Sequence, residues 1–223
     1  MNKTAEIKIK VISFDLDGTL VKKTFADLVW LEGLPKIYAE EKNISIEKAK
    51  QYLKKEYNEI GENKPEWYDL KFWFKHFNLK HDWKKLLNHY RYAIEKYPDT
   101  TPTLEELRKK YNLIIASNAK REFIEIELKE AHIKKFFTHI FSSTSDFNKV
   151  KKLTSFYSMI CNKLEINPDE MIHIGDHIEF DYHIPKRIGI TSYYLDRKKT
   201  THGEFIVHNL LEFKEKIRKN ISH

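Results

Sequence analysis

Acidic side chains stand at the ends of two apolar runs that lie far apart in the chain. Asp15 and Asp17 follow the first run, two residues apart, and Asp176 follows a much later one. Carboxylates crowded into one site raise each other's pKa unless a cation lies between them. Oxygen ligands without histidine or thiolate suit a hard ion, so these residues predict a magnesium (Mg2+) site.

Groups that suit an anionic ligand accompany these carboxylates. Ser117 supplies a hydroxyl directly after an apolar run, and Asn118 and Ala119 supply backbone N–H groups near an expected helix start, where anions are favoured. Phosphoryl transfer also needs a positive charge near the phosphate oxygens. Three lysines before the helix that leads to Asp176 are candidates: Lys149, Lys151 and Lys152. Together these groups indicate phosphoryl-transfer chemistry.

The elements that must position these groups are strands separated by helices. Strands are expected at residues 7–14, 112–117, 139–142, 170–176, 191–195 and 204–207. Their alternation with helical patterns predicts an α/β fold, a Rossmann-like doubly wound parallel sheet with helices on both faces. Ligands of such sheets bind beyond the carboxyl ends of the strands. Asp15, Ser117 and Asp176 all stand at such ends.

Residues 21–98 have a different pattern from the rest of the chain. They contain all four tryptophans and no convincing strand, and their aromatic residues recur at helical spacing. Ser45 and Asp82 are plausible N-caps of two of these helices. We therefore expect a catalytic core at 1–20 and 99–223, with an α-helical cap domain inserted at 21–98. In the core, Thr103 to Glu106 form a capping box that opens the next helix.

Composition limits the kind of partner. The 223 residues are 41% hydrophobic and 33% charged, as in an ordinary globular protein, and the net charge of +7 is spread without a long basic run. We expect no nucleic-acid partner. No apolar run approaches the roughly 20 residues that span a bilayer, and the N-terminus lacks a signal-peptide pattern, so we expect a cytoplasmic protein without a membrane anchor. The oligomeric state has no sequence signal.

Several motifs resemble those of the haloacid dehalogenase-like superfamily. Residues 14–20, with their Asp-x-Asp-Gly-Thr-Leu string, resemble its first motif, and residues 114–118 resemble its second. Residues 174–181 resemble its fourth motif, a Gly-Asp pair followed by another aspartate. The run from 187 to 197 also resembles members with an inserted cap. The resemblance covers about 1–20 and 99–215, and it implies a capped phosphatase.

The resemblance implies a role for each matching residue. Asp15 attacks phosphorus and forms an aspartyl-phosphate, and Asp17 protonates the leaving group and then activates water. The carboxylates of Asp15 and Asp176 and the backbone carbonyl of Asp17 hold Mg2+. Ser117, with Asn118, binds the phosphoryl group. Asp181 either contacts the residues that bind the metal ion or binds the ion through water.

The chain departs from the family pattern at three positions. No proline follows the third-motif lysine; the usual interval to Asp176 selects Lys151, and Lys149 and Lys152 stay open as alternatives. His177 replaces a common serine and is either a surface residue or a substrate contact. Phe180 replaces a common asparagine, which alters the surroundings of the metal site.

Asp17 indicates the reaction. Dehalogenases of the superfamily lack this second aspartate because a halide leaves without a proton, whereas an alkoxide benefits from an acid. We therefore predict a phosphohydrolase that cleaves a small phosphomonoester. Alternatives are a phosphomutase, a dehalogenase or a non-catalytic binding module. A cap that excludes macromolecules favours a small phosphorylated metabolite. Residues 22–25 are candidates for substrate contact, and most cap aromatics are expected in the cap's own core.

Overall fold

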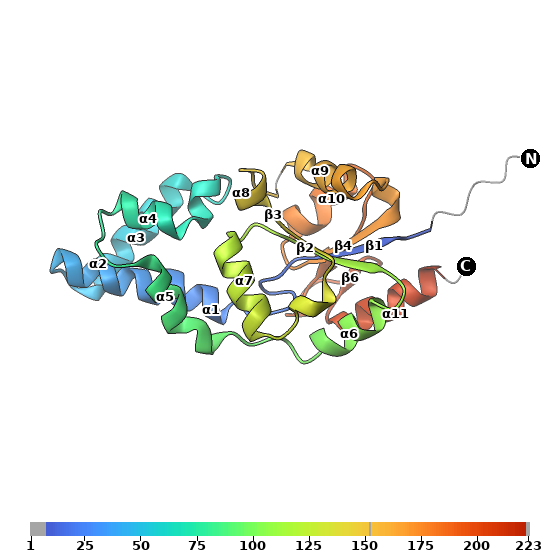
Figure 1. The fold of residues 1–223 in the computed structure, drawn as a ribbon, viewed down its shortest axis with the longest axis horizontal. Coiled ribbons are helices and arrows are strands. Elements are labelled where there is room, and N and C mark those ends of the chain that lie inside the picture. Colours follow the sequence, from blue (N-terminus) through green and yellow to red (C-terminus); the bar gives the residue numbers. More distant parts are fainter. Residues whose placement is uncertain (1–7, 152, 222–223) are drawn as a thin grey trace, which may run out of the picture.

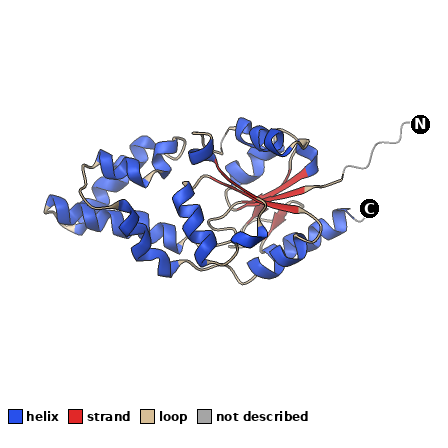
Figure 2. Ribbon diagram, in the orientation of Figure 1, coloured by secondary structure: helices blue, strands red, loops and turns tan. Residues whose placement is uncertain are grey.

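The computed structural model describes residues 8–151 and 153–221, and its centre is a six-stranded parallel sheet (Figures 1 and 2). The strands are β1 (Val11–Phe14), β2 (Asn112–Ser117), β3 (His139–Ser142), β4 (Met171–Gly175), β5 (Thr191–Leu195) and β6 (Ile206–Val207). Their order across the sheet is β3-β2-β1-β4-β5-β6. The chain winds outward in both directions from β1, so the predicted doubly wound sheet is confirmed. The switch point of the topology lies at the ends of β1, β2 and β4.

Helices cover both faces of the sheet because its strands are apolar on both sides. The flanking helices are α6 (Thr100–Leu107), α7 (Arg121–Glu130), α8 (Ser143–Asp146), α9 (Thr154–Leu164), α10 (Ile184–Lys186) and α11 (Leu210–Ile221). Ile12 and Phe14 of β1 pack toward α6, α7 and α11, whereas Val11 packs toward α9 and α10. Figure 1 shows these two layers below and above the sheet. Alternate residues of one strand thus enter two separate cores.

Short helical turns complete the core. They are two 3₁₀ turns, η4 (Lys134–Phe136) and η5 (Pro168–Glu170), and a π-helix, η6 (Ile178–His183). The sequence predicts one helix from residue 179 to 188, but the structure divides this segment into η6 and α10. The π-helix follows directly after Asp176 and is one turn of wider backbone, a form that is frequent at functional sites.

The helical insert, from Thr24 to Ala93, lies between β1 and α6. It consists of α1 (Thr24–Asp27), the π-helix η1 (Leu28–Gly33), α2 (Leu34–Lys42), α3 (Ile46–Ile60), the 3₁₀ turn η2 (Pro65–Tyr68), α4 (Leu70–His76), α5 (Trp83–Tyr90) and the 3₁₀ turn η3 (Arg91–Ala93). Buried Phe25, Leu53 and Trp73 belong to a hydrophobic core within the insert. Figure 1 shows the insert beyond the carboxyl ends of the strands.

The N-caps proposed for two insert helices are confirmed. The Ser45 hydroxyl accepts a hydrogen bond from Lys48 N–H at the start of α3, and the Asp82 carboxylate accepts one from Lys84 N–H at the start of α5. Both helices therefore begin where a side-chain oxygen satisfies a backbone N–H that lacks an intrahelical partner.

The capping box predicted at Thr103 is wrong, because α6 already begins at Thr100. Long-range contacts set this start. The Thr100 hydroxyl donates to the Leu20 carbonyl (2.8 Å), and the Asp99 carboxylate binds Arg197 (3.0 Å). Pro102 lies in the first turn, where a helix tolerates a residue without an N–H group.

Three strands are shorter than the sequence predicts, and one of them, β4, covers Met171–Gly175 rather than residues 170–176. β1 covers Val11–Phe14 rather than residues 7–14, of which residue 7 lies outside the described ranges, and β6 covers only Ile206–Val207. β6 pairs only with β5, so only part of the predicted strand finds a partner. Over the described ranges, no helix combines the length and the apolar character needed to cross a membrane.

Candidate active site

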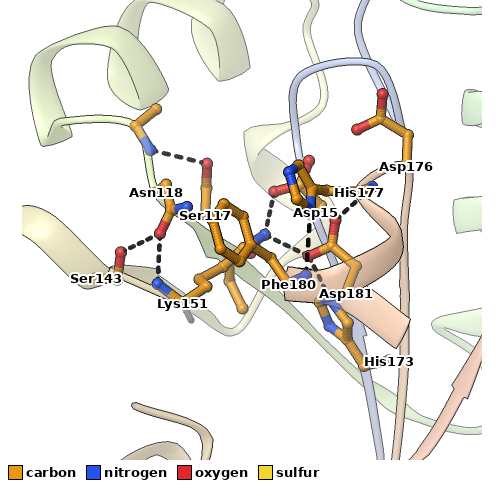
Figure 3. Close-up of polar contacts among 12 residues, drawn as sticks. Asp15, Ser117, Asn118, Ser143, Lys151, His173, Asp176, His177, Phe180 and Asp181 are labelled. Atoms are coloured by element: carbon orange, nitrogen blue, oxygen red, sulfur yellow. Dashed lines mark hydrogen bonds and ion pairs between the residues drawn. The ribbon is translucent and has the colours of Figure 1, made fainter. Parts of the chain in front are cut away.

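Polar side chains from three neighbouring strands meet at the carboxyl edge of the sheet (Figure 3). Asp15 follows β1, Ser117 ends β2 and Asp176 follows β4, and all three line one cavity. The Asp15 backbone N–H donates to the Ile174 carbonyl of β4 (2.9 Å), which fixes the position of Asp15 beside that strand. The structure therefore brings together residues that the sequence separates by 59 to 161 positions.

A buried lysine completes this edge. Lys151 reaches the site from the loop before α9, and its side-chain nitrogen lies 2.5 Å from Asp15 Oδ1 and 2.6 Å from Asp181 Oδ1. It also donates to the Ala116 carbonyl (3.1 Å). A buried charge needs such partners, because its removal from water is costly. Lys149 instead donates to Ser155 (3.3 Å) outside this cluster, and Lys152 lies outside the described residues.

Asp181 pairs with Lys151 from η6, the π-helix that follows β4. Its Oδ2 atom accepts a hydrogen bond from His177 N–H (3.0 Å), and its Oδ1 atom lies 3.1 Å from His173 Nε2. Burial alone would raise the pKa of Asp181, but Lys151 and His173 outweigh burial and hold this pKa well below its usual range. Gly175 makes room, since a Cβ atom there would lie 2.3 Å from Asp181 Cγ. The role that the sequence left open for Asp181 thus includes positioning Lys151.

Three carboxylates at this edge fit a hard divalent ion. One oxygen each from Asp15, Asp176 and Asp181 lies within 4.8 Å of the others. Lys23 Nζ lies 2.7 Å from Asp176 Oδ2, so a positive group already meets this cluster. An all-oxygen donor set with a cationic neighbour agrees with Mg2+ chemistry. The carboxylate of Asp17 does not belong to this group; the contact expected from its backbone carbonyl stays a prediction.

The electrostatics of the cluster also favour a cation. Burial raises the pKa of Asp15 to about 8, although Lys151 opposes it, and Asp181 and Asp176 raise it further. Burial likewise raises the pKa of Asp176, against the effect of Lys23. A divalent ion between these oxygens would lower both pKa values and keep the carboxylates ionised.

Asp17 has different surroundings from Asp15. Its Oδ1 atom is buried and has no hydrogen-bond partner among the described residues, and burial raises its pKa. Gly18 next to it has φ +78°, and a Cβ atom there would lie 2.3 Å from Asp176 Oδ2. Only glycine fits this turn, since other residues resist positive φ and would displace the Asp176 carboxylate.

Glu127 of α7, which belongs to no motif of the sequence, lies near Asp17. Its side chain is fully buried, and neither carboxylate oxygen has a hydrogen-bond partner in the described chain. Burial, and then the charge of Asp17, raise the pKa of Glu127 well above its usual range, so this side chain is neutral. The available signal was its place on the apolar face of α7, with Phe123, Ile124 and Leu128.

The predicted phosphate-binding residues have distinct roles in the fold. Ser117 Oγ accepts a hydrogen bond from Ala119 N–H (3.1 Å), which leaves its hydroxyl hydrogen to be donated elsewhere. Asn118 Oδ1 accepts from Lys151 N–H and from Ser143 Oγ, both at 2.7 Å. The Asn118 side chain therefore positions the Lys151 loop, and substrate contact by its backbone N–H stays a prediction.

A cavity of about 290 Å³ lies between the sheet edge and the helical insert. This volume is at the lower end of the range for ligand pockets. Of the four residues expected near the entrance, Lys23 lines the cavity, whereas Phe25 lies in the core of the insert. Trp73 is in that core as expected, but Trp67 lines the cavity instead.

His177 lies in the cavity wall. Its ring stacks on Phe180 with centroids 4.0 Å apart, and its Nδ1 atom accepts a hydrogen bond from Phe180 N–H (3.2 Å). This hydrogen bond caps the start of η6 and fixes the ring. His177 thus lines the cavity while 40% of its side chain is exposed, and contact with a substrate stays a prediction.

Solved structures with the same fold include phosphatases and dehalogenases. The HAD phosphatase from Thermococcus onnurineus superposes with a TM-score of 0.83 at 25% identity, over 94% of this chain and 98% of that chain. The 2-haloacid dehalogenase from Pseudomonas syringae superposes with a TM-score of 0.69 at 16% identity, over 95% of this chain and 99% of that chain. A predicted phosphoglycolate phosphatase from Haemophilus somnus superposes with a TM-score of 0.63 at 18% identity, over 93% of this chain and 97% of that chain.

The match to a family model is broad. No curated protein matches the sequence, but the model of the haloacid dehalogenase-like hydrolases matches residues 9–189. This range contains the whole cavity edge, from Asp15 to Asp181, together with the helical insert. The chain is therefore a member of the haloacid dehalogenase-like hydrolase family.

Proposed function

We propose that the protein is a Mg2+-dependent phosphomonoester hydrolase that works through an aspartyl-phosphate on Asp15. The observation that supports this reaction is the environment of Asp17. Its carboxyl group is buried in the cavity wall, and burial raises its pKa, which favours the protonated form that an alkoxide leaving group needs. A halide leaving group has no use for such an acid.

The first step transfers the phosphoryl group to the protein. A carboxylate oxygen of Asp15 forms a bond to phosphorus while the bond from phosphorus to the ester oxygen breaks, and Asp17 gives its proton to that oxygen. Lys151, buried and charged, and the Ser117 hydroxyl bind phosphoryl oxygens. Mg2+ held by Asp15, Asp176 and Asp181 would offset the negative charge of the phosphate when bound.

The second step regenerates Asp15. Asp17, now ionised, takes a proton from water, whose oxygen attacks phosphorus and breaks the bond to Asp15. Inorganic phosphate leaves, and Asp17 is protonated again for the next cycle. One side chain thus acts as acid and then as base, which agrees with a carboxyl group whose pKa is moved toward neutrality.

The helical insert acts as the cap over this chemistry. Asn118 Nδ2 donates to the Tyr68 hydroxyl (3.3 Å), and Lys120 Nζ lies 3.0 Å from Asp69 Oδ2. These contacts join the core to the insert at the cavity. A closed cap excludes water, and the cavity volume of about 290 Å³ favours a small phosphorylated metabolite as substrate.

Phosphate release from a panel of phosphomonoesters, measured with Mg2+ and with excess EDTA, tests this proposal. We expect release with Mg2+ that EDTA abolishes and that Asp15→Asn reduces to background. Asp169→Asn, an exposed aspartate in η5, is the matched control and should keep full activity. Chloride release from 2-chloropropionate without phosphate release from any ester would support the dehalogenase alternative instead.

A further inference from the structure

Aromatic side chains surround the part of the cavity beyond the catalytic carboxylates. Trp30 of η1 and Trp67 and Tyr68 of η2 come from the insert, and Phe123 of α7 and Phe180 of η6 come from the core. In the proposed reaction this space receives the leaving group, since Asp15 and Lys151 hold the phosphate at the edge of the sheet.

One aromatic wall is a fixed flat surface. Trp30 stacks on Phe123 with ring centroids 5.6 Å apart and planes within 2° of parallel. Tyr57 meets Trp30 edge-on at 6.2 Å, and its hydroxyl donates to the Trp30 carbonyl (3.2 Å). Contacts on several sides thus hold the Trp30 ring before any ligand binds.

A second aromatic segment is held by its backbone and its hydroxyl group. The Trp67 carbonyl accepts a hydrogen bond from the indole of buried Trp73 (3.2 Å). The Tyr68 hydroxyl donates to the Glu62 carbonyl (3.1 Å) and accepts from Asn118. Rings that are already ordered bind a flat group with little loss of side-chain entropy, and they stack best on another planar π-system.

The lysines of this space already have anionic partners. Lys120 Nζ lies 3.0 Å from Asp69 Oδ2, and both side chains are largely shielded from solvent. Lys23 Nζ lies 2.7 Å from Asp176 Oδ2. Lys120 is therefore not available to bind a second anionic group of a substrate, and Lys23 is held at the carboxylate cluster.

Two carboxylates without a lysine or arginine partner among the described residues also lie at the cavity wall. The carboxylate of Asp27 makes no hydrogen bond or ion pair within the described part of the chain, and the carboxylate of Glu62 meets only His177, at 3.9 Å. Asp27 lies one helical turn after Lys23, and its N–H donates to the Lys23 carbonyl (2.8 Å).

We propose that the substrates are phosphomonoesters whose leaving group carries a planar ring and no negative charge. This inference rests on the proposed hydrolase function. Stacking against the ring walls provides the attraction, and the carboxylates of Asp27 and Glu62 repel an anionic leaving group.

Two pairs of esters test ring shape and charge separately. Benzyl phosphate and cyclohexylmethyl phosphate are both esters of primary alcohols with seven carbon atoms, and they differ in planarity. We expect kcat/KM to be about tenfold higher for the planar ester. 4-Carboxybenzyl phosphate adds one negative charge to the same ring, and we expect its kcat/KM to be at least about tenfold below that of benzyl phosphate.

The failure of this inference differs from the failure of the proposed function. Equal kcat/KM for benzyl and cyclohexylmethyl phosphate, or for the benzyl and carboxybenzyl esters, would overturn the inference while the hydrolase function stands. No phosphate from any ester would overturn both.

Variants locate the selectivity in the cavity wall. Trp67→Leu should lower the ratio of benzyl to cyclohexylmethyl kcat/KM toward one, whereas Tyr92→Leu, at an aromatic that is 75% exposed outside the cavity, should leave the ratio unchanged. Asp27→Asn should raise the relative kcat/KM of the carboxybenzyl ester, and Asp169→Asn should not. Because each readout is a ratio, partial unfolding of a variant does not affect it. Unchanged ratios in Trp67→Leu and Asp27→Asn would contradict this assignment of the walls.

Discussion

Asp15 and Asp17 are two residues apart, yet they have different neighbours. Asp15 meets Lys151 at 2.5 Å and belongs to the cluster of metal-compatible oxygens. Asp17 instead has a buried oxygen without a partner and lies near the neutral Glu127. The chain leaves β1 before Asp15 and turns at Gly18 (φ +78°), so the two carboxylates meet different neighbours although they are two residues apart.

This difference predicts that Asp17→Asn separates the two chemical steps. p-Nitrophenolate leaves without a proton, so we expect a burst of about one equivalent of nitrophenolate from p-nitrophenyl phosphate, followed by arrest as the aspartyl-phosphate. Turnover of an alkyl ester should fall by roughly 10²–10⁴-fold, the usual contribution of a general acid. Rapid-quench kinetics measure the burst. Steady-state turnover equal to that of the unaltered protein would show that Asp17 is not the acid.

At the scale of an element, the start of α1 carries a lysine that reaches the metal cluster. Burial works against the charge of Lys23, but Asp176 outweighs burial and raises the pKa of this lysine. The ammonium group therefore competes with a divalent ion for Asp176 Oδ2 (2.7 Å).

Removal of this competitor should strengthen metal binding. We expect Lys23→Met to bind Mg2+ about tenfold more tightly in isothermal titration calorimetry without substrate, since a positive charge near the ion is lost. Lys22→Met serves as the control, because Lys22 is the neighbour of Lys23 in the sequence and pairs with Glu95 rather than with Asp176. An Mg2+ affinity of Lys23→Met equal to that of the control would contradict competition at Asp176.

The loop after β5 is organised by one carboxylate. Asp196 accepts hydrogen bonds from the backbone N–H and the hydroxyl of both Thr200 and Thr201, at 2.7–2.9 Å. Burial raises the pKa of Asp196, but these hydrogen bonds outweigh burial and hold the pKa well below its usual range.

A depressed pKa makes this loop a pH-dependent source of stability. The contribution of Asp196 is complete above its unfolded pKa of about 3.9 and decreases as pH falls through the lower folded value. We expect Asp196→Asn to lower the free energy of unfolding at pH 6, and the difference from the unaltered protein to narrow below about pH 4. Urea titrations at several pH values measure this difference. A constant difference from pH 6 to pH 3 would contradict the assignment.

At the scale of the whole molecule, the insert and the core share one site. The Tyr68 hydroxyl of the insert meets Asn118, which in turn holds the backbone of Lys151 and the hydroxyl of Ser143. The position of the insert is therefore coupled to the loop that carries the buried lysine.

Tyr68→Phe tests this coupling while it keeps the aromatic wall. The variant removes two hydrogen bonds, one to the Glu62 carbonyl within the insert and one to Asn118 of the core. Loss of the bond to Asn118, with a net value of about 1 kcal/mol, should raise KM for an ester that the enzyme hydrolyses about fivefold. Tyr92→Phe, at an exposed ring outside the site, is the matched control. Steady-state kinetics measure both variants, and an unchanged KM in Tyr68→Phe would show that this contact does not stabilise the closed arrangement.

The sequence by itself determined the parallel sheet, the helical insert and the residues at the strand ends. These features depend on interactions within a few residues, so they can be recognised without a structure: apolar β-branched runs, helical spacing, and caps such as Ser45 and Asp82. Because parallel strands place their carboxyl ends at one edge, Asp15, Ser117 and Asp176 were expected together, and all three line the cavity.

Only the tertiary structure decided which lysine enters the site, where α6 begins, and that Glu127 is buried and Trp67 lines the cavity. Lys151 and Asp15 are 136 positions apart, and the start of α6 depends on contacts with Leu20 and Arg197. Local preferences among Lys149, Lys151 and Lys152 are nearly equal, so the choice depends on partners that only the packed fold brings within hydrogen-bonding distance.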